Sequence, residues 1–129
     1  MGLGAGAIAI LAALSDEEAT EILELNKEAI HNVRPELDLT VLTEHIQNAR
    51  TLGYGLNPGL VFPGSWAIAA VIKAPSGEIL GALTIAAIES RLTDERQKEL
   101  SIPLFEEVRR IEQLLAKFGQ NGLRFMEAG

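Results

Sequence analysis

Before its first charged residue, Asp16, the chain is almost entirely apolar. The segment from Ala7 to Leu14 contains only Ala, Ile and Leu, which predicts a short buried helix without a polar face. Ser15 follows, with Glu18 three residues further on, a spacing typical of a capping box at a helix start. One helix is predicted from here toward Pro35, where it must end. Its apolar face consists of Ala19, Ile22, Leu23, Ala29 and Ile30.

A third helix is predicted from about Asp38 to Gly53, because glycine adopts the left-handed conformation that ends helices. Its inward positions are Leu39, Leu42, Ile46 and Ala49. From Tyr54 to Ser65 glycine and proline are so frequent that a shaped loop with short extended pieces is expected instead of regular structure. Loops of this kind often carry function.

Two apolar runs, Trp66 to Ile72 and Glu78 to Ala87, flank a turn at Ala74–Gly77 and predict an antiparallel hairpin. Both runs read as buried on both faces. Because two strands are unstable as a sheet on their own, further strands are expected to be missing. We therefore expect a truncated domain whose cut face is covered by a symmetry mate or a swapped partner.

A long terminal helix is predicted after Thr93, a capping residue, with Pro103 kinking or dividing it and Gly119 ending it. Apolar residues at alternating spacings of four and three define its inner face: Leu104, Val108, Ile111, Leu115 and Phe118. The predicted order is α-α-α-β-β-α, an α+β fold with helices covering an antiparallel sheet. Residues 1–119 would form one partial domain and residues 120–129 a tail.

Composition narrows the function. A hydrophobic content of 47% against 22% charged residues suggests a surface that is partly buried by another chain. Eleven basic and eighteen acidic residues give a net charge of −7, which disfavours direct binding to nucleic acid or an anionic membrane. The absence of cysteine excludes disulfides and thiolate metal sites and fits a cytoplasmic protein. The apolar run at Met1–Leu14 has no positive charge for a signal peptide and is too short to span a bilayer.

Several modest motifs follow one another in a fixed order over residues 2–118. They are Gly4-Ala5-Gly6 before an apolar helix, Ser15–Glu18, the helix end Ala49–Tyr54, Gly64–Val71, the Ser76-Gly77 turn, Gly81–Ile85 and Ser90–Thr93. This order resembles the C-terminal half of the effector-binding domain of IclR-family transcriptional regulators. No single motif is specific, but their succession over most of the chain is.

The resemblance implies a GAF-like α+β sensor domain that binds a small metabolite, often a carboxylate. In such regulators occupancy is coupled to an N-terminal winged helix-turn-helix within a dimer or tetramer. That DNA-binding module and the first strands of the sensor domain have no counterpart here, in agreement with the strand deficit. Met1 would then be a start within a longer coding frame.

The glycine-rich start from Gly2 to Ala7 is the first candidate site. It fits the nucleotide fingerprint G-x-G-x-x-A, which requires a strand immediately before it. Alternatively, Gly4, Ala5 and Gly6 expose backbone N–H groups at a helix N-terminus, where a carboxylate is attracted. The glycines could also serve only close packing.

The resemblance places further pocket positions at Asn57, Ala67, Thr84 and Ala86. Thr84 and Ala86 are two apart and so face the same side of a strand. Many family members have Cys at Ala67, a second hydroxyl at Ala86 and often Asp at Asn57. Their replacement predicts a less polar ligand, one that uses Asn57 as both donor and acceptor, or a degenerate site. Trp66 points to the opposite face of the strand from Ala67, so it is expected to have a structural packing role.

Metal and catalytic signals are weak. His31 and His45 do not lie at metal-ligand spacing with carboxylates, and no cofactor is expected. The predicted function is therefore a non-enzymatic, small-molecule-sensing domain of an IclR-like regulator, which forms homo-oligomers and reaches DNA only through a missing N-terminal domain. The alternatives are a small enzyme or nucleotide-binding protein that uses the Gly2–Ala7 turn, or a purely structural association module.

Overall fold

The architecture is a small antiparallel sheet between helices. The structure is a computed structural model that describes residues 4–33, 35, 38–60 and 64–128, with the backbone alone for 33 and 119–128. Within these residues the sheet has three antiparallel strands in the order β1-β2-β3. They are β1 (Gly55–Pro58), β2 (Ser65–Lys73) and β3 (Ile79–Ile88). The α+β class predicted from the sequence is confirmed.

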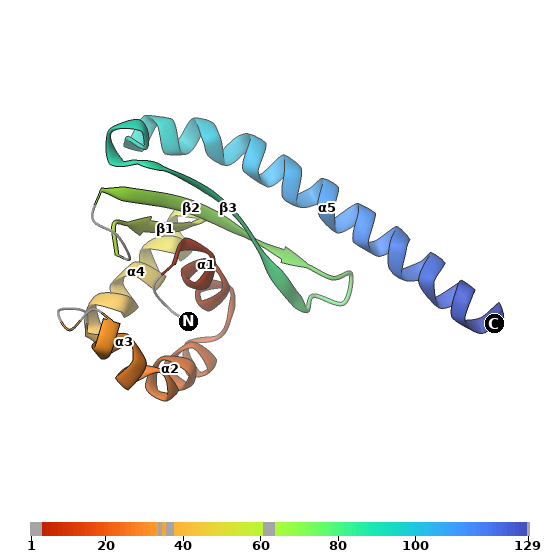
Figure 1. Cartoon of the computed structure of the whole chain (residues 1–129), viewed down its shortest axis with the longest axis horizontal. Coiled ribbons are helices and arrows are strands. Elements are labelled where there is room, and N and C mark those ends of the chain that lie inside the picture. The colour runs from red at the N-terminus through yellow and green to blue at the C-terminus, as the bar shows by residue number, and fades with distance from the viewer. Residues whose placement is uncertain (1–3, 34, 36–37, 61–63, 129) are drawn as a thin grey trace.

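Helices cover both faces of this sheet (Figure 1). The long helix α5 runs across one face, whereas α1 packs on the other and the remaining helices gather beyond α1. The helices are α1 (Ala5–Ala13), α2 (Asp16–Leu25), α3 (Lys27–Val33), α4 (Leu39–Leu52) and α5 (Asp94–Ala128). A short 3-10 turn, Glu89–Arg91, joins β3 to α5.

The predicted helix caps are present. The Ser15 hydroxyl accepts from the Glu18 N–H at 3.2 Å, and the Glu18 side chain accepts from the Ser15 N–H in return, which completes the capping box. The Asp38 carboxylate accepts from the Val41 N–H at 2.9 Å, and Gly53 ends α4 with a φ of 86°. Local sequence is sufficient for these ends because each cap bonds only its own helix.

The prediction of a single helix after Ser15 is wrong, because the helix is interrupted at Asn26, which separates α2 from α3. The side-chain amide of Asn26 donates to the Ile22 carbonyl at 2.8 Å. Asparagine competes in this way for backbone groups that a continuing helix would use.

The two-strand count is also wrong, because β1 lies inside the glycine-rich loop. Its register pairs Gly55 with Ala69 and Pro58 with Trp66. The second expectation, that both hairpin strands are buried on both faces, holds only for the middle of β2. In β3, Thr84 and Ala86 are exposed.

Helix α5 is longer than predicted. Pro103 does not divide it, and Gly119 does not end it. A glycine inside a helix costs about 1 kcal/mol, which weakens the helix without stopping it. Leu104 and Val108 are buried against the sheet, whereas Phe118 further along is 77% exposed. The C-terminal part of α5 projects beyond the sheet (Figure 1).

Helix α1 lies unusually close to β1, and Gly55 is the reason. A Cβ placed on Gly55 would lie 2.8 Å from the Ala9 nitrogen and 2.9 Å from the Ala9 Cβ, and closer still to the Ala5 carbonyl oxygen. No side chain fits between the two backbones. On its other side α1 contributes Ile8 and Leu11, 1% and 0% exposed, to the core shared with α2, α3 and α4.

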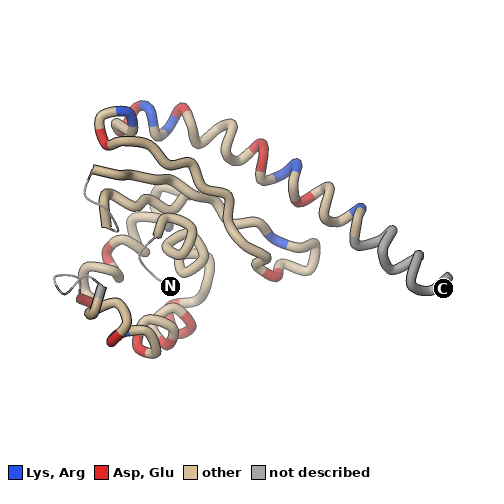
Figure 2. Tube along the Cα trace, in the orientation of Figure 1, with Lys and Arg blue, Asp and Glu red and all other residues tan. Residues whose placement is uncertain are grey.

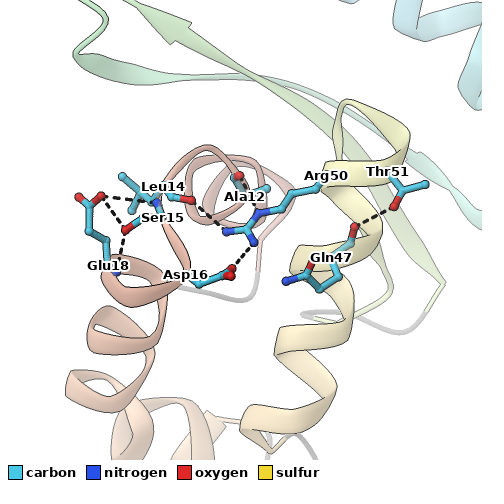
Figure 3. Close-up of polar contacts among 8 residues, drawn as sticks. All are labelled: Ala12, Leu14, Ser15, Asp16, Glu18, Gln47, Arg50 and Thr51. Atoms are coloured by element: carbon cyan, nitrogen blue, oxygen red, sulfur yellow. Dashed lines mark hydrogen bonds and ion pairs between the residues drawn. The ribbon is translucent and has the colours of Figure 1, made fainter.

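The end of α1 is held by Arg50 from α4 (Figure 3). Its Nε donates to the Ala12 carbonyl at 3.0 Å and its Nη2 to the Leu14 carbonyl at 2.9 Å, and it also forms an ion pair with Asp16. These carbonyls are the groups that a helix leaves without partners at its C-terminus. Arg50 therefore ties together α1, the following turn and the first residue of α2.

Candidate functional site

The structure brings the seven predicted site positions to one side of the sheet. Asn57 of β1 pairs with Ala67 of β2, and Ala67 pairs with Ala86 of β3, so these three form one row across the sheet. Thr84 lies in the next row, opposite Ala69. The same side carries α1, whose first residues Gly4, Ala5 and Gly6 complete the set.

The N-terminus of α1 lies over β3. A Cβ on Gly6 would be 3.5 Å from both the Thr84 hydroxyl and the Ala82 Cβ. The helix begins at Gly4 without a side-chain cap, and the first N–H groups of a helix have no acceptor within it. Backbone donors and the Thr84 hydroxyl thus lie side by side, a combination suited to an oxygen-bearing ligand.

The candidate positions differ in exposure. Thr84 and Ala86 are exposed, whereas Ala67 is covered by the α1 N-terminal turn and packs in one cluster with Ala5. A ligand on this face would therefore meet β3 and the edge of α1 first. Ala67 would shape the floor and make little direct contact.

Asn57 has a structural partner that the sequence reasoning missed. It is only 6% exposed, and its Oδ1 accepts from the Leu60 N–H at 2.6 Å. An asparagine oxygen bonded to the backbone three residues later is a common turn device, and the nearby Gly59 is a signal that could have indicated it. The Oδ1 of Asn57 is therefore already engaged by the protein and is less available as an acceptor for a ligand.

The elements that form the site carry almost no charged residues. Helix α1, β1 and β3 contain no charged residue, and β2 has only Lys73 at its far end. Figure 2 shows acidic residues on α2, on α5 and at the hairpin turn, but none within the three strands. An anion here would be held by backbone N–H groups and the helix dipole, without a side-chain counterion.

A cavity of about 300 Å³ lies at the other end of α1 and involves none of the seven positions. Its walls are small residues of α1 and β2 together with Arg50, Tyr54 and Phe105. The Arg50 donors already serve Ala12, Leu14 and Asp16, and the Tyr54 hydroxyl donates to the Gln97 Oε1 at 3.2 Å. Its polar side chains are thus engaged by the protein itself.

Neither histidine belongs to a metal site in the described residues, where no group of three His, Cys, Asp or Glu side chains converges. Partial burial in α4 lowers the pKa of His45, although Glu44 opposes the shift.

Across the described ranges no helix has the length and apolar character needed to cross a bilayer. Trp66 packs against the α5 side of the sheet, as its strand parity predicts.

Comparison with known proteins identifies the domain. The family described as "Bacterial transcriptional regulator IclR C-terminal" matches residues 3–113. No curated protein matches the chain.

Several solved structures with the same fold are described as transcriptional regulators or repressors. The repressor BlcR of Agobacterium tumefaciens is 20% identical with a TM-score of 0.70, over 89% of this chain and 47% of that one. The IclR protein of Thermotoga maritima is 22% identical with a TM-score of 0.73, over 89% and 47%. The C-terminal domain of the regulator KdgR of E. coli is 23% identical with a TM-score of 0.75, over 89% and 70%. The chain therefore spans about half the length of the longer relatives.

Proposed function

The chain belongs to the family of IclR bacterial transcriptional regulators, of which it forms part of the C-terminal effector-binding domain, and we propose that it senses a small carboxylate. The ligand would lie against the N-terminus of α1 and contact the hydroxyl of Thr84 on β3. The observation that supports this proposal is the placement of the uncapped helix start directly beside an exposed hydroxyl.

The chemistry of the face sets the ligand class. A carboxylate can accept hydrogen bonds from the first N–H groups of α1. Its negative charge is also stabilised by the positive end of the helix dipole. Ala67 and Ala69 are buried under α1, so an apolar body would lie against the exposed side chain of Ala86. A compact acid with an apolar tail fits this combination better than a polar keto-acid, for which the face lacks hydrogen-bonding side chains.

Ligand binding is proposed to act through subunit arrangement and without catalysis. A ligand shifts an equilibrium between two arrangements only as far as its affinities for them differ. DNA contact would belong to another part of the regulator, because the net charge of −7 repels phosphates. Such a regulator works in the cytoplasm, where its DNA is.

Thermal unfolding with a panel of small aliphatic and aromatic carboxylates, with nucleotides included, tests the proposal. At a ligand concentration of 100 times Kd, the stabilisation amounts to about 2.7 kcal/mol. Thr84→Val keeps the shape of the side chain and removes the hydroxyl, so we expect it to reduce the shift. Gly6→Ala adds a methyl group that the fold tolerates but that fills the space toward Thr84, so we expect it to block binding.

Thr43→Val is the matched control, since Thr43 is an exposed threonine on α4 remote from the sheet. It should leave the ligand shift unchanged. Asn57→Ala is a poorer probe than sequence alone suggests, because it also removes the acceptor of the Leu60 N–H. A thermal shift with nucleotides alone would replace the carboxylate proposal with nucleotide binding. If no compound shifted the unfolding temperature, the remaining interpretation would be a purely structural association module.

A further inference from the structure

Strand β1 is shorter than β2 and leaves part of the β2 edge unpaired (Figure 1). The last pair at this end joins Gly55 to Ala69, and the same register would place Gly53 opposite Val71. Gly53, however, is the left-handed end of α4, and its N–H donates back to the Ala49 carbonyl at 2.8 Å. Among the described residues, the β2 edge at Val71 therefore meets the end of a helix where a partner strand would otherwise continue.

The hydrogen bonds show that the backbone groups of Val71 point into this gap. The Glu89 N–H donates to the Gly64 carbonyl at 2.9 Å, so the carbonyl of Gly64 points toward β3. The direction of these groups alternates along an antiparallel strand, and the register with β3 is regular up to Ile72. The N–H and C=O of Val71 therefore point away from β3. Lys73, two residues further on, also points outward, and its N–H donates to a carboxylate oxygen on α5 at 2.7 Å.

The cavity of about 300 Å³ at the end of α1 lies at this gap, and Val71 is one of its lining residues. Cavities that bind small molecules begin at about this size, are mostly apolar and carry a few converging polar groups. Alanines and glycines form most of the walls, and Phe105 of α5 adds half-buried aromatic surface. Because the polar side chains here already bond within the protein, the N–H and C=O of Val71 are the groups best placed to orient a ligand.

Electrostatics at this cavity disfavour an anion. Helices α1 and α4 both end here, and Ala13 and Gly53 from these ends line the cavity. The carbonyl end of a helix carries a partial negative charge. The positive charge of Arg50 is already paired with Asp16. A neutral ligand that offers an N–H donor therefore suits this end of α1, whereas the opposite end suits a carboxylate.

We propose that this cavity binds a small neutral molecule with a primary amide or a lactam. The N–H and C=O of one extended residue lie side by side and point the same way, as an antiparallel ladder requires. An amide group whose own N–H and C=O are cis can accept from the Val71 N–H and donate to the Val71 carbonyl at the same time. An apolar ring attached to it would contact the alanines of α1 and the ring of Phe105. This site shares none of the seven positions of the carboxylate site and does not depend on it.

Amide NMR of the isotopically labelled chain, titrated with benzamide and with δ-valerolactam, tests the proposal. We expect a saturable shift of the Val71 amide resonance, accompanied by shifts at Gly53 and Ala13. Methyl benzoate has the same ring and a carbonyl but no N–H, so it should bind about tenfold more weakly than benzamide, as the loss of one hydrogen bond to a partly buried group implies. Benzoate should leave the Val71 resonance unchanged, because its charge is unfavourable at two helix C-termini.

Ala13→Phe should abolish the benzamide titration. Ala13 is an exposed lining residue on the last turn of α1, so a larger side chain there can fill the cavity without entering the core. Ala29→Phe is the matched control, since Ala29 is also an exposed helical alanine but lies on α3, outside the cavity. It should titrate like the wild type. The amide spectrum of each variant checks that the chain remains folded.

The proposal is wrong if neither amide shifts the Val71 resonance up to the solubility limit of the probe. It is also wrong if methyl benzoate binds as tightly as benzamide, or if Ala13→Phe binds benzamide like the wild type. A carboxylate response at Thr84 without an amide response at Val71 would contradict only this site. The reverse result would contradict only the proposed carboxylate, so the two proposals fail separately.

Discussion

Gly55 offers the sharpest test of the packing between α1 and the sheet. In Gly55→Ala, the added Cβ would lie 2.8 Å from the Ala9 nitrogen and 2.9 Å from the Ala9 Cβ. Favourable carbon contacts are about 3.5–4.0 Å, so α1 would have to move by roughly 1 Å. Such a movement is opposed from behind, because Ile8 and Leu11 are buried in the helical core.

Overpacking of a core costs about 1–3 kcal/mol, and the backbone partners place Gly55→Ala near the upper end. A loss of about 3 kcal/mol in a domain of this size lowers Tm by about 10 °C. Urea unfolding, followed by the fluorescence of Trp66, the only tryptophan, measures the free energy directly.

Gly81→Ala is the matched control for this experiment. Gly81 also lies in a strand, but a Cβ there meets nothing within 4 Å. We expect its stability to change by less than about 0.5 kcal/mol. The reasoning would be refuted if Gly55→Ala were as stable as Gly81→Ala, because α1 would then be free to shift on the sheet.

Four further predictions concern the helix ends and Tyr54. Ser15→Ala should cost about 1 kcal/mol in urea unfolding, because it removes the cap of α2. Arg50→Met should cost about 2 kcal/mol through the lost bonds to the Ala12 and Leu14 carbonyls, and an equally stable variant would show that water replaces them. Arg50 also lowers the pKa of Asp16 from its ordinary value of 3.8, so the stability difference between wild type and Asp16→Asn should be present above that pH. It should disappear in acid as pH falls through the lowered pKa. Burial, followed by the charge of Asp94, raises the pKa of Tyr54 from 10.0. Because Tyr54 is the only tyrosine, its phenolate absorbance should appear above that pH, and stability should fall as pH rises through the raised pKa.

Much of the fold follows from local sequence, and the failures show where it does not. The caps at Ser15, Asp38 and Gly53 were predictable because each acts within its own helix end. Strand β1 was not, since Gly-Leu-Asn-Pro has no strand propensity and is extended only through its pairing with β2. Gly55 looked like a loop breaker, although its role is to admit the backbone of α1.

The candidate site shows the same division. Strand alternation correctly placed Thr84 and Ala86 on one side, because it depends only on parity. The cover that Ala5 provides over Ala67, and the bond from the Leu60 N–H to Asn57, depend on tertiary contacts or turn geometry. The part played by these positions in ligand binding stays a prediction.

Helix α1 has nine residues, too few for an isolated helix to be stable in water. Its order depends on Gly55 beneath it and Arg50 at its end, which lie far along the chain. Its order therefore depends on α4 and the strands, and because it is buried between the sheet and the helical core its amides should exchange only when these neighbours also open. A molecule bound at its first turn would slow that opening, so amide exchange in α1 would report occupancy even if the average structure did not change.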